Sequence, residues 1–144
     1  MALRPARSLE SAFLDDRFPD QNGTCDVDPT IREEKGAIHL AYRLEEHAEC
    51  AVITFVQAGE WSYGGPNDEA LAKRNLWGLG LRPYEFYYVV PAPAAEMTEW
   101  LVTFHDGCFR IIASDVAVLS RSVVSDSPAD ALDVCVGEGV NRVL

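Results

Sequence analysis

Apolar and polar side chains alternate regularly through residues 37–44. Two sets are separated by this alternation: Ile38, Leu40, Tyr42 and Leu44 face one way, and Ala37, His39, Ala41 and Arg43 face the other. A period of two predicts a strand with one buried face. Residues 50–56 are apolar on both sides, which favours a central strand. The acidic turn between these two runs predicts that they pair as a hairpin.

Three further runs have strand character. Residues 84–90 are rich in aromatic and β-branched side chains, with Tyr84, Phe86 and Tyr88 on one side; these rings either pack within the sheet or form an aromatic wall for a partner. Runs 101–105 and 108–113 flank Asp106-Gly107, a dipeptide that favours a two-residue type I′ hairpin. The chain then continues into another apolar run from Val116 to Leu119.

Helices are indicated at three places. Residues 8–15 carry apolar side chains on one helical face, and residues 68–75 follow a capping Asn67 or Asp68. Ser127 and Pro128 have the pattern of an N-cap followed by proline at the first helical position, predicting a helix over 129–136. The rest of residues 1–36 is polar and rich in turn formers.

Short connections between the expected strands favour antiparallel pairing. We therefore expect an α+β fold: a single antiparallel β-sheet of about five or six strands with short helices covering one face. At 144 residues the chain is expected to form a single domain, with 1–36 as a loop-rich N-terminal lead and 37–144 as the sheet-containing core.

The formal net charge of −11 disfavours several partners. Such a surface repels phosphate backbones and anionic membranes, so we expect no nucleic-acid binding and no membrane binding. Two interpretations of the charge remain open. It serves solubility alone, or it guides the protein onto a basic partner.

No cofactor is expected from the sequence. The four cysteines form no CxxC pair, the three histidines have neither HxH nor HxxxH spacing, and no nucleotide-binding glycine motif occurs. We therefore expect no metal. No apolar run is long enough to span a bilayer, and the start lacks the apolar core of a secretory signal. These features predict a cytoplasmic protein with free thiols.

The Asp106-Gly107 hairpin is the first candidate for chemistry. Counting outward from this turn sets His105 opposite Cys108 and Thr103 opposite Arg110 on one face, with apolar residues on the core face. An imidazole beside a thiol can generate a thiolate nucleophile, and Arg110 could bind an anionic group. Alternatively, His105 is a strand-end residue bonded to Asp106 or to the backbone, and Cys108 is a small hydrophobic side chain.

The segment from Glu60 to Glu69 is the second candidate. It combines three carboxylates, Glu60, Asp68 and Glu69, with two large aromatic side chains, Trp61 and Tyr63. A carboxylate held against an aromatic wall has a raised pKa and can act as a general acid or base. The alternative is a surface loop held in place by its aromatic side chains, with the residues from 67 onward capping a helix.

Three pieces of this region resemble motifs of a family of small uncharacterised bacterial proteins. They are Trp61-x-Tyr-Gly-x-Pro-Asn-Asp-Glu, Leu76-Trp-Gly-x-Gly-Leu-x-Pro-Tyr and Thr103-Phe-His-Asp-x-x-Phe. The resemblance covers about residues 55–113 and implies that the Pro-Asn-Asp-Glu loop and the His-Asp turn belong to one shared feature. The chain departs from the family pattern at Arg74-Asn75, which replaces His-Pro, and at Arg110, which replaces Glu.

Two functions follow as hypotheses. In the first, a small-molecule pocket lies between the 61–69 loop and the Asp106 turn and performs acid–base catalysis on an anionic metabolite. Its catalytic residues are His105, Asp68 and Glu69, and its binding residues are Trp61, Tyr63, Asn67, Asp106, Cys108 and Arg110. In the second, the chain is an acidic protein-binding module of the immunity or inhibitor type. Carboxylates converging in an apolar cleft favour the pocket, whereas carboxylates spread beside protruding aromatic side chains favour the protein partner.

Overall fold

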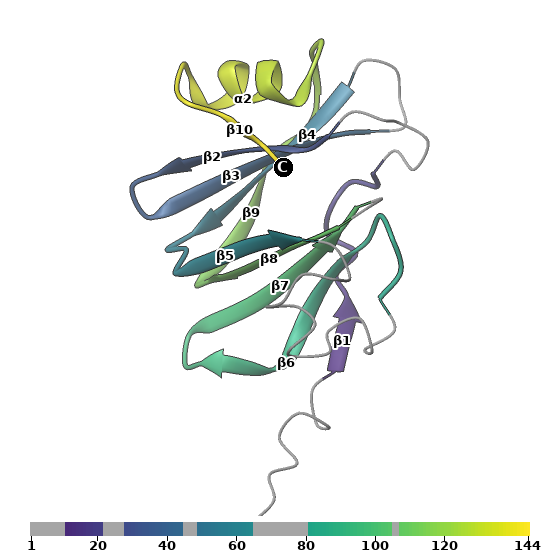
Figure 1. Ribbon diagram of the computed structural model, residues 1–144, viewed down its shortest axis with the longest axis vertical. Coiled ribbons are helices and arrows are strands. Elements are labelled where there is room, and N and C mark those ends of the chain that lie inside the picture. The colour runs from purple at the N-terminus through teal and green to yellow at the C-terminus, as the bar shows by residue number, and fades with distance from the viewer. Residues whose placement is uncertain (1–10, 22–27, 45–48, 65–80, 105–106) are drawn as a thin grey trace, which may run out of the picture.

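The computed structural model describes residues 11–21, 28–44, 49–64, 81–104 and 107–144, and these form two antiparallel five-stranded sheets (Figure 1). The first sheet has the order β1-β6-β7-β8-β5, with bounds Ser11–Leu14, Phe86–Ala94, Met97–Thr103, Cys108–Ala113 and Glu60–Gly64. The second has the order β10-β2-β3-β4-β9, with bounds Arg142–Val143, Thr30–Glu34, Ala37–Arg43, Glu49–Val56 and Asp115–Val124. The described helix, α2, spans Pro128–Val136.

The expected fold class, a single sheet covered by short helices, is wrong. The inner faces of two sheets pack against each other, and Phe55 of the second sheet contacts both Trp100 and Phe109 of the first, with ring centroids 5.7 and 6.0 Å apart. The inner face of each sheet is therefore covered for the most part by the other sheet. A period of two predicts that a strand has a buried face, but it does not say what covers that face.

The individual strands were predicted more successfully. β3 and β4 form the expected hairpin, with Leu40 opposite Ile53, and β4 is an interior strand of its sheet. The apolar set of residues 37–44 faces the core as predicted. The helix prediction at the C-terminal end is confirmed as well, because Ser127 Oγ accepts a hydrogen bond of 3.1 Å from the Asp130 backbone N–H.

Three local predictions are wrong. Residues 11–14 are a strand rather than part of a helix, residues 60–64 are a strand rather than a loop, and β2 lies within the expected loop-rich lead. In each case, pairing with a strand distant in sequence decides the conformation, for example Phe13 opposite Tyr88. The expected helix over residues 68–75 lies outside the described residues.

The hairpin between β7 and β8 differs from the prediction in its register. Thr103 pairs with Cys108 and Val102 with Phe109, and Phe104 N–H donates a 2.8 Å hydrogen bond to Gly107 O. The pair that closes the hairpin is therefore Phe104 and Gly107, whereas the predicted turn would be closed by His105 and Cys108. Each residue of β7 therefore pairs with a residue of β8 two positions away from the predicted partner. Because side chains alternate between faces with a period of two, a shift of two leaves the predicted core and outer faces unchanged.

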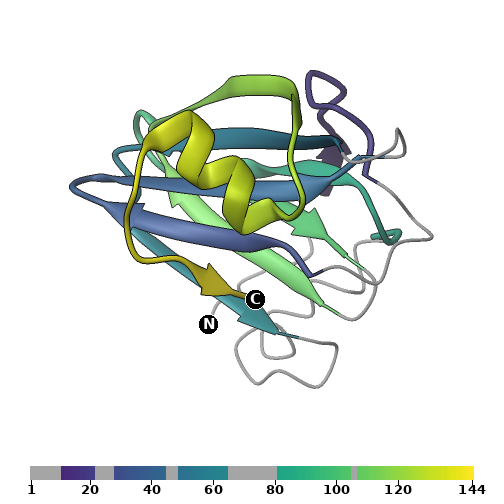
Figure 2. The same ribbon diagram turned by 90° about the horizontal axis from the view of Figure 1, so that it is seen from above.

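Helix α2 lies across the outer face of the second sheet (Figure 2). Its Ala131 and Leu132 are fully buried against Ala41, Cys50 and Val52 of the sheet. This packing explains why the second apolar side of residues 50–56 also avoids solvent.

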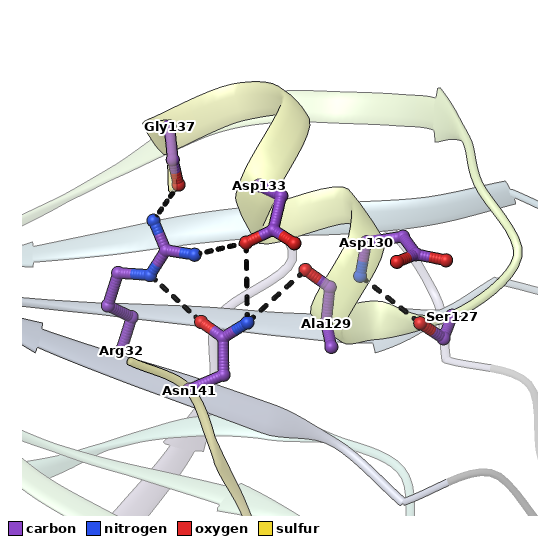
Figure 3. A network of polar contacts seen from close by, with 7 residues as sticks. All are labelled: Arg32, Ser127, Ala129, Asp130, Asp133, Gly137 and Asn141. Atoms are coloured by element: carbon purple, nitrogen blue, oxygen red, sulfur yellow. Dashed lines mark hydrogen bonds and ion pairs between the residues drawn. The ribbon is translucent and has the colours of Figure 1, made fainter. Parts of the chain in front are cut away.

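The buried Arg32 side chain binds α2 and the segment that follows it through hydrogen bonds and an ion pair (Figure 3). Arg32 Nε donates to Asn141 Oδ1 at 2.8 Å, Nη2 contacts Asp133 Oδ1 at 2.5 Å, and Nη1 donates to the Gly137 carbonyl. Its side chain is 1% exposed. Since every nitrogen of the guanidinium has a partner, this charge is accommodated inside the fold and is structural.

Candidate functional site

The two segments proposed above as candidate sites, Glu60–Glu69 and the Asp106-Gly107 hairpin, have neighbouring residues in the structure. Gly64, at the end of β5, pairs with Cys108, at the start of β8. A Cβ atom added to Gly107 would lie 2.7 Å from the Tyr63 ring, so that ring lies directly over Gly107. The predicted site residues Asn67, Asp68, Glu69, His105 and Asp106 lie outside the described residues. The part of the chain that is described places the flanks of both segments at the same end of the first sheet.

Trp61 and Tyr63 lie on the core face of β5. The Trp61 ring packs against Phe109 at a centroid distance of 5.8 Å, and the Arg142 guanidinium lies 5.3 Å from the Trp61 ring centroid. Tyr63 packs near Phe104 at 6.4 Å. Both aromatic residues are half-buried, so part of each surface remains available to solvent.

Cys108 has the environment of a structural thiol. Its side chain is buried among Leu101, Tyr87 and Val89, and the residue is 1% exposed. Burial raises the pKa of the Cys108 thiol to about 12, with a further contribution from the Glu99 carboxylate. A thiol in this environment is protonated at neutral pH, whereas nucleophilic catalysis needs the thiolate.

Arg110 is held by carboxylates of its own sheet. Its Nε donates to buried Glu99, and its Nη2 donates to the exposed Glu60 at 3.0 Å. The predicted role of anchoring an anion would require a ligand to displace one of these carboxylates. Thr103, predicted on the same face, is fully buried and accepts a 3.0 Å hydrogen bond from Glu85 N–H.

A hollow beside β1 was not found by the sequence analysis. It has a volume of about 420 Å³ and is lined by Leu14, Asp15, Asp16, Arg17, Tyr88, Thr98 and Trp100. Tyr88 faces the same side of the first sheet as the buried Phe86, yet it is 36% exposed. The second sheet therefore does not cover this part of the inner face, and Figure 1 shows β6 and β1 at the edge of the first sheet that lies away from the second.

Asp15 is a fixed negative charge in the wall of this hollow. Arg17 donates to both of its carboxylate oxygens, from Nε at 2.8 Å and from Nη2 at 2.5 Å. Burial raises the pKa of Asp15, but the hydrogen bonds from Arg17 outweigh that effect and leave the pKa below its ordinary value. The Trp100 indole N–H makes no hydrogen bond of normal geometry, although it lies close enough to Asp15 to help lower this pKa.

Exposed apolar side chains surround the hollow. Phe13 and Tyr88 stack with ring centroids 5.6 Å apart, and a set of apolar residues in β1 and β6 is exposed to water. This set, named here the β1 patch, comprises Phe13 (47% exposed), Tyr88 (36%) and Val90 (44%) on one face of the sheet, together with Leu14 (58%) at the rim of the hollow. Asp15 and Asp16 follow directly along the chain, and the exposed Asp20 comes four residues after Asp16. This is the arrangement of protruding aromatic side chains beside carboxylates that favours a protein partner.

A second, smaller hollow of about 100 Å³ adjoins the first and shares Leu14, Asp15 and Asp16 with it. Tyr84 lines this hollow with a φ of 62°, a left-handed conformation that tyrosine rarely adopts. Asp20 and Glu85 add two further carboxylates. Despite this acidity, no three His, Cys, Asp or Glu side chains among the described residues are arranged to hold a metal ion.

One sequence signal could have identified this region. Phe13, Leu14, Asp15, Asp16 and Arg17 are contiguous, and apolar side chains next to a run of charges are unusual in a solvated helix. The predicted helix over residues 8–15 puts Phe13 and Leu14 on a single buried face, so their exposure is not expected from it. In the observed strand these two side chains point to opposite sides.

Comparison with protein-family models, with curated proteins and with solved structures found no match to this chain. The resemblance to a bacterial family therefore stays a prediction. Within the described parts of the chain, no helix has the length and apolar character needed to cross a membrane.

Proposed function

We propose that this protein is a binding module that docks a basic partner protein on the β1 patch. The observation that carries the proposal is the exposure of Phe13, Leu14 and Tyr88 directly beside the carboxylates of Asp15 and Asp16. Apolar side chains at the centre of a contact supply affinity, and charges around them supply orientation and a fast association rate. The net charge of −11 acts in the same direction over longer distances.

The form of the hollow supports a protein partner over a small molecule. Ligand pockets of comparable volume bury most of the ligand surface. Here Leu14 is 58% exposed and the Arg17 side chain is 57% exposed, so a small molecule would keep much of its surface in water. A protein surface would cover the hollow and its rim together.

Site-specific photo-crosslinking tests this proposal. A photoreactive phenylalanine is placed at Leu14, and a matched control carries it at Val134, an exposed residue of α2 on the other side of the molecule. We expect a discrete protein adduct from position 14 in the cells that make the protein, and none from position 134. The adducted partner should be basic, and its association rate should fall steeply with salt. Equal crosslinking from both positions, or none from position 14, would contradict the proposal.

A cytoplasmic location is part of the same proposal. Cys108 and Cys135 are free thiols in the described part of the chain, which suits a reducing compartment. Their modification state in the native protein, measured by mass spectrometry, checks this point.

A small-molecule site at the opposite edge of the first sheet is the second candidate. It is favoured by one observation, that Tyr63 lies over Gly107 and Gly64 pairs with Cys108. The described residue before the 65–80 segment is therefore close to the residues that follow the 105–106 segment, which supports acid–base chemistry by Asp68, Glu69 and His105. The test is native mass spectrometry of the wild type and of the variants His105→Ala and Asp68→Asn. A bound small mass that survives both changes in folded protein contradicts this assignment.

A further inference from the structure

We propose that the hollow beside β1 receives an arginine side chain of the partner protein. This inference rests on the proposed function and names the group that the site recognises. The hollow combines carboxylate and aromatic walls, which together match a planar guanidinium better than any other common side chain.

Negative charge predominates around the hollow. Asp15 and Asp16 line it, Asp20 and Glu85 line the adjoining hollow, and Asp115 lies near Arg17. The cations named beside these groups are Arg17, which is already paired with Asp15 through two hydrogen bonds, and Arg121, which donates to the Arg17 carbonyl. Five carboxylates against these two cations leave a local excess of negative charge, which an incoming cation would neutralise.

Asp16 is the carboxylate that we expect to bind the partner's arginine. It is exposed, it lines the hollow, and no hydrogen bond joins its side chain to another described residue. Asp15, by contrast, is 6% exposed and held by Arg17, so it acts as a fixed background charge. A guanidinium can donate two parallel hydrogen bonds to a carboxylate such as that of Asp16.

Aromatic side chains provide the surface on which a guanidinium can stack. The Tyr88 ring is 36% exposed and is held in place by its stacking on Phe13. Arg17 shows that the same chemistry operates nearby, because it pairs with Asp15 and also lies 5.3 Å from the Phe18 ring centroid. Lysine lacks the planar group that such stacking requires, so the site should prefer arginine.

Trp100 provides an independent indication that the free site is incomplete. The residue lines the hollow and is 4% exposed, and its indole N–H has no hydrogen bond of normal geometry. The Asp15 carboxylate lies near this N–H but does not meet it at hydrogen-bond geometry, so the buried donor is incompletely satisfied, which is costly. A backbone carbonyl beside the bound arginine would relieve that cost.

Peptide titration followed by NMR tests the inference directly. The probes are acetyl-Gly-Ser-Arg-Ser-Gly-amide and the same peptide with lysine or with citrulline, the neutral analogue of arginine. The readouts are the dissociation constant and the shift of the Trp100 indole N–H signal. We expect millimolar binding of the arginine peptide, weaker binding of the lysine peptide, and about tenfold weaker binding of the citrulline peptide.

Matched variants assign the contact to the hollow. Asp16→Asn should weaken binding of the arginine peptide about tenfold, whereas Asp126→Asn, the same charge change beside α2, should leave it within about twofold. Tyr88→Leu should weaken binding and Tyr88→Phe should retain it, because the ring rather than the hydroxyl stacks. Equal binding of the arginine and citrulline peptides, equal loss in the two Asp variants, or no saturable shift would overturn the inference.

The two proposals fail separately. If the adduct from position 14 forms but Asp16→Asn and Tyr88→Leu bind the arginine peptide as well as the wild type does, the binding surface stands and the arginine site is wrong. If no adduct forms from position 14, the proposed function itself is wrong.

Discussion

Gly107 lies beneath the phenol ring of Tyr63, and this contact has no room for a side chain. An added Cβ would be 2.7 Å from both Tyr63 Cζ and Oη and 3.0 Å from the Gly64 carbonyl oxygen. Gly107 was expected in a two-residue turn. In the structure it also lies beside the end of β5, so an added methyl group would displace the Tyr63 ring and crowd the Gly64 carbonyl.

We therefore expect Gly107→Ala to lower the free energy of unfolding by about 1–3 kcal/mol, the usual cost of an overpacked contact. Urea denaturation measures the change. Gly59→Ala is the matched control, since its added Cβ would meet its nearest neighbours at 3.8 Å, an ordinary contact distance. A loss of the same size in both variants would contradict the explanation.

Arg32 joins three elements that are far apart in sequence. From β2 it reaches Asp133 in α2, the Gly137 carbonyl at the end of that helix, and Asn141 before β10 (Figure 3). Helix α2 has a good N-cap and proline start, so its position along the chain was predictable. Its attachment to the sheet was not, because no local pattern pairs Arg32 with residues about a hundred positions away.

Replacing Arg32 with lysine should destabilise the fold by about 2 kcal/mol, because an ammonium cannot donate to three divergent acceptors. Amide hydrogen exchange should show the largest loss of protection in α2. Asp133→Asn serves as the comparison and should cost less, since that carboxylate is 45% exposed. Unchanged protection of α2 in Arg32→Lys would show that the helix is held by its apolar contacts alone.

At the scale of the whole molecule, several buried titratable groups make stability depend on pH. Burial lowers the pKa of His39, and Arg32 adds to this effect while Glu34 opposes it. Asp15 also has a lowered pKa, whereas burial raises the pKa of Cys108 to about 12. Each shift favours the form that is present near neutral pH, so stability should be greatest there.

The sign of each contribution follows from which state binds more protons. Below the ordinary histidine pKa of 6.5, the unfolded chain takes up a proton that folded His39 resists, so the free energy of unfolding falls as pH falls. Below 3.8 the unfolded chain protonates Asp15 before the folded protein does, and stability falls again. Above about pH 9 the unfolded chain ionises Cys108 first, so stability falls as pH rises.

Urea unfolding at a series of pH values checks this profile. His39→Gln should remove the decrease that begins near pH 6.5 and leave the decrease below pH 4 in place, because Asp15 lies on the other sheet. An unchanged slope near pH 6.5 in this variant would mean that His39 titrates alike in both states.

The strands with a clear apolar pattern and the capped helix were predictable from local sequence alone. The alternation of residues 37–44 and the apolar run of residues 50–56 both indicate strands, because successive side chains of a strand point to opposite faces wherever it lies. Both faces of β3 are buried in the structure, since α2 covers the outer one. The same local rule separated the two faces of β7 and β8 correctly, even though the register was two residues off.

Contacts between segments that are distant in sequence determine the number of sheets, the strand character of β1 and β5, and the hollow beside β1. Short segments such as Ser11–Leu14 and Glu60–Gly64 have too few residues to establish a period, and they become strands because β6 and β8 supply hydrogen-bond partners. The hollow exists because the second sheet leaves Tyr88 and its neighbours uncovered. That depends on how two sheets of unequal extent overlap, which no local alternation encodes.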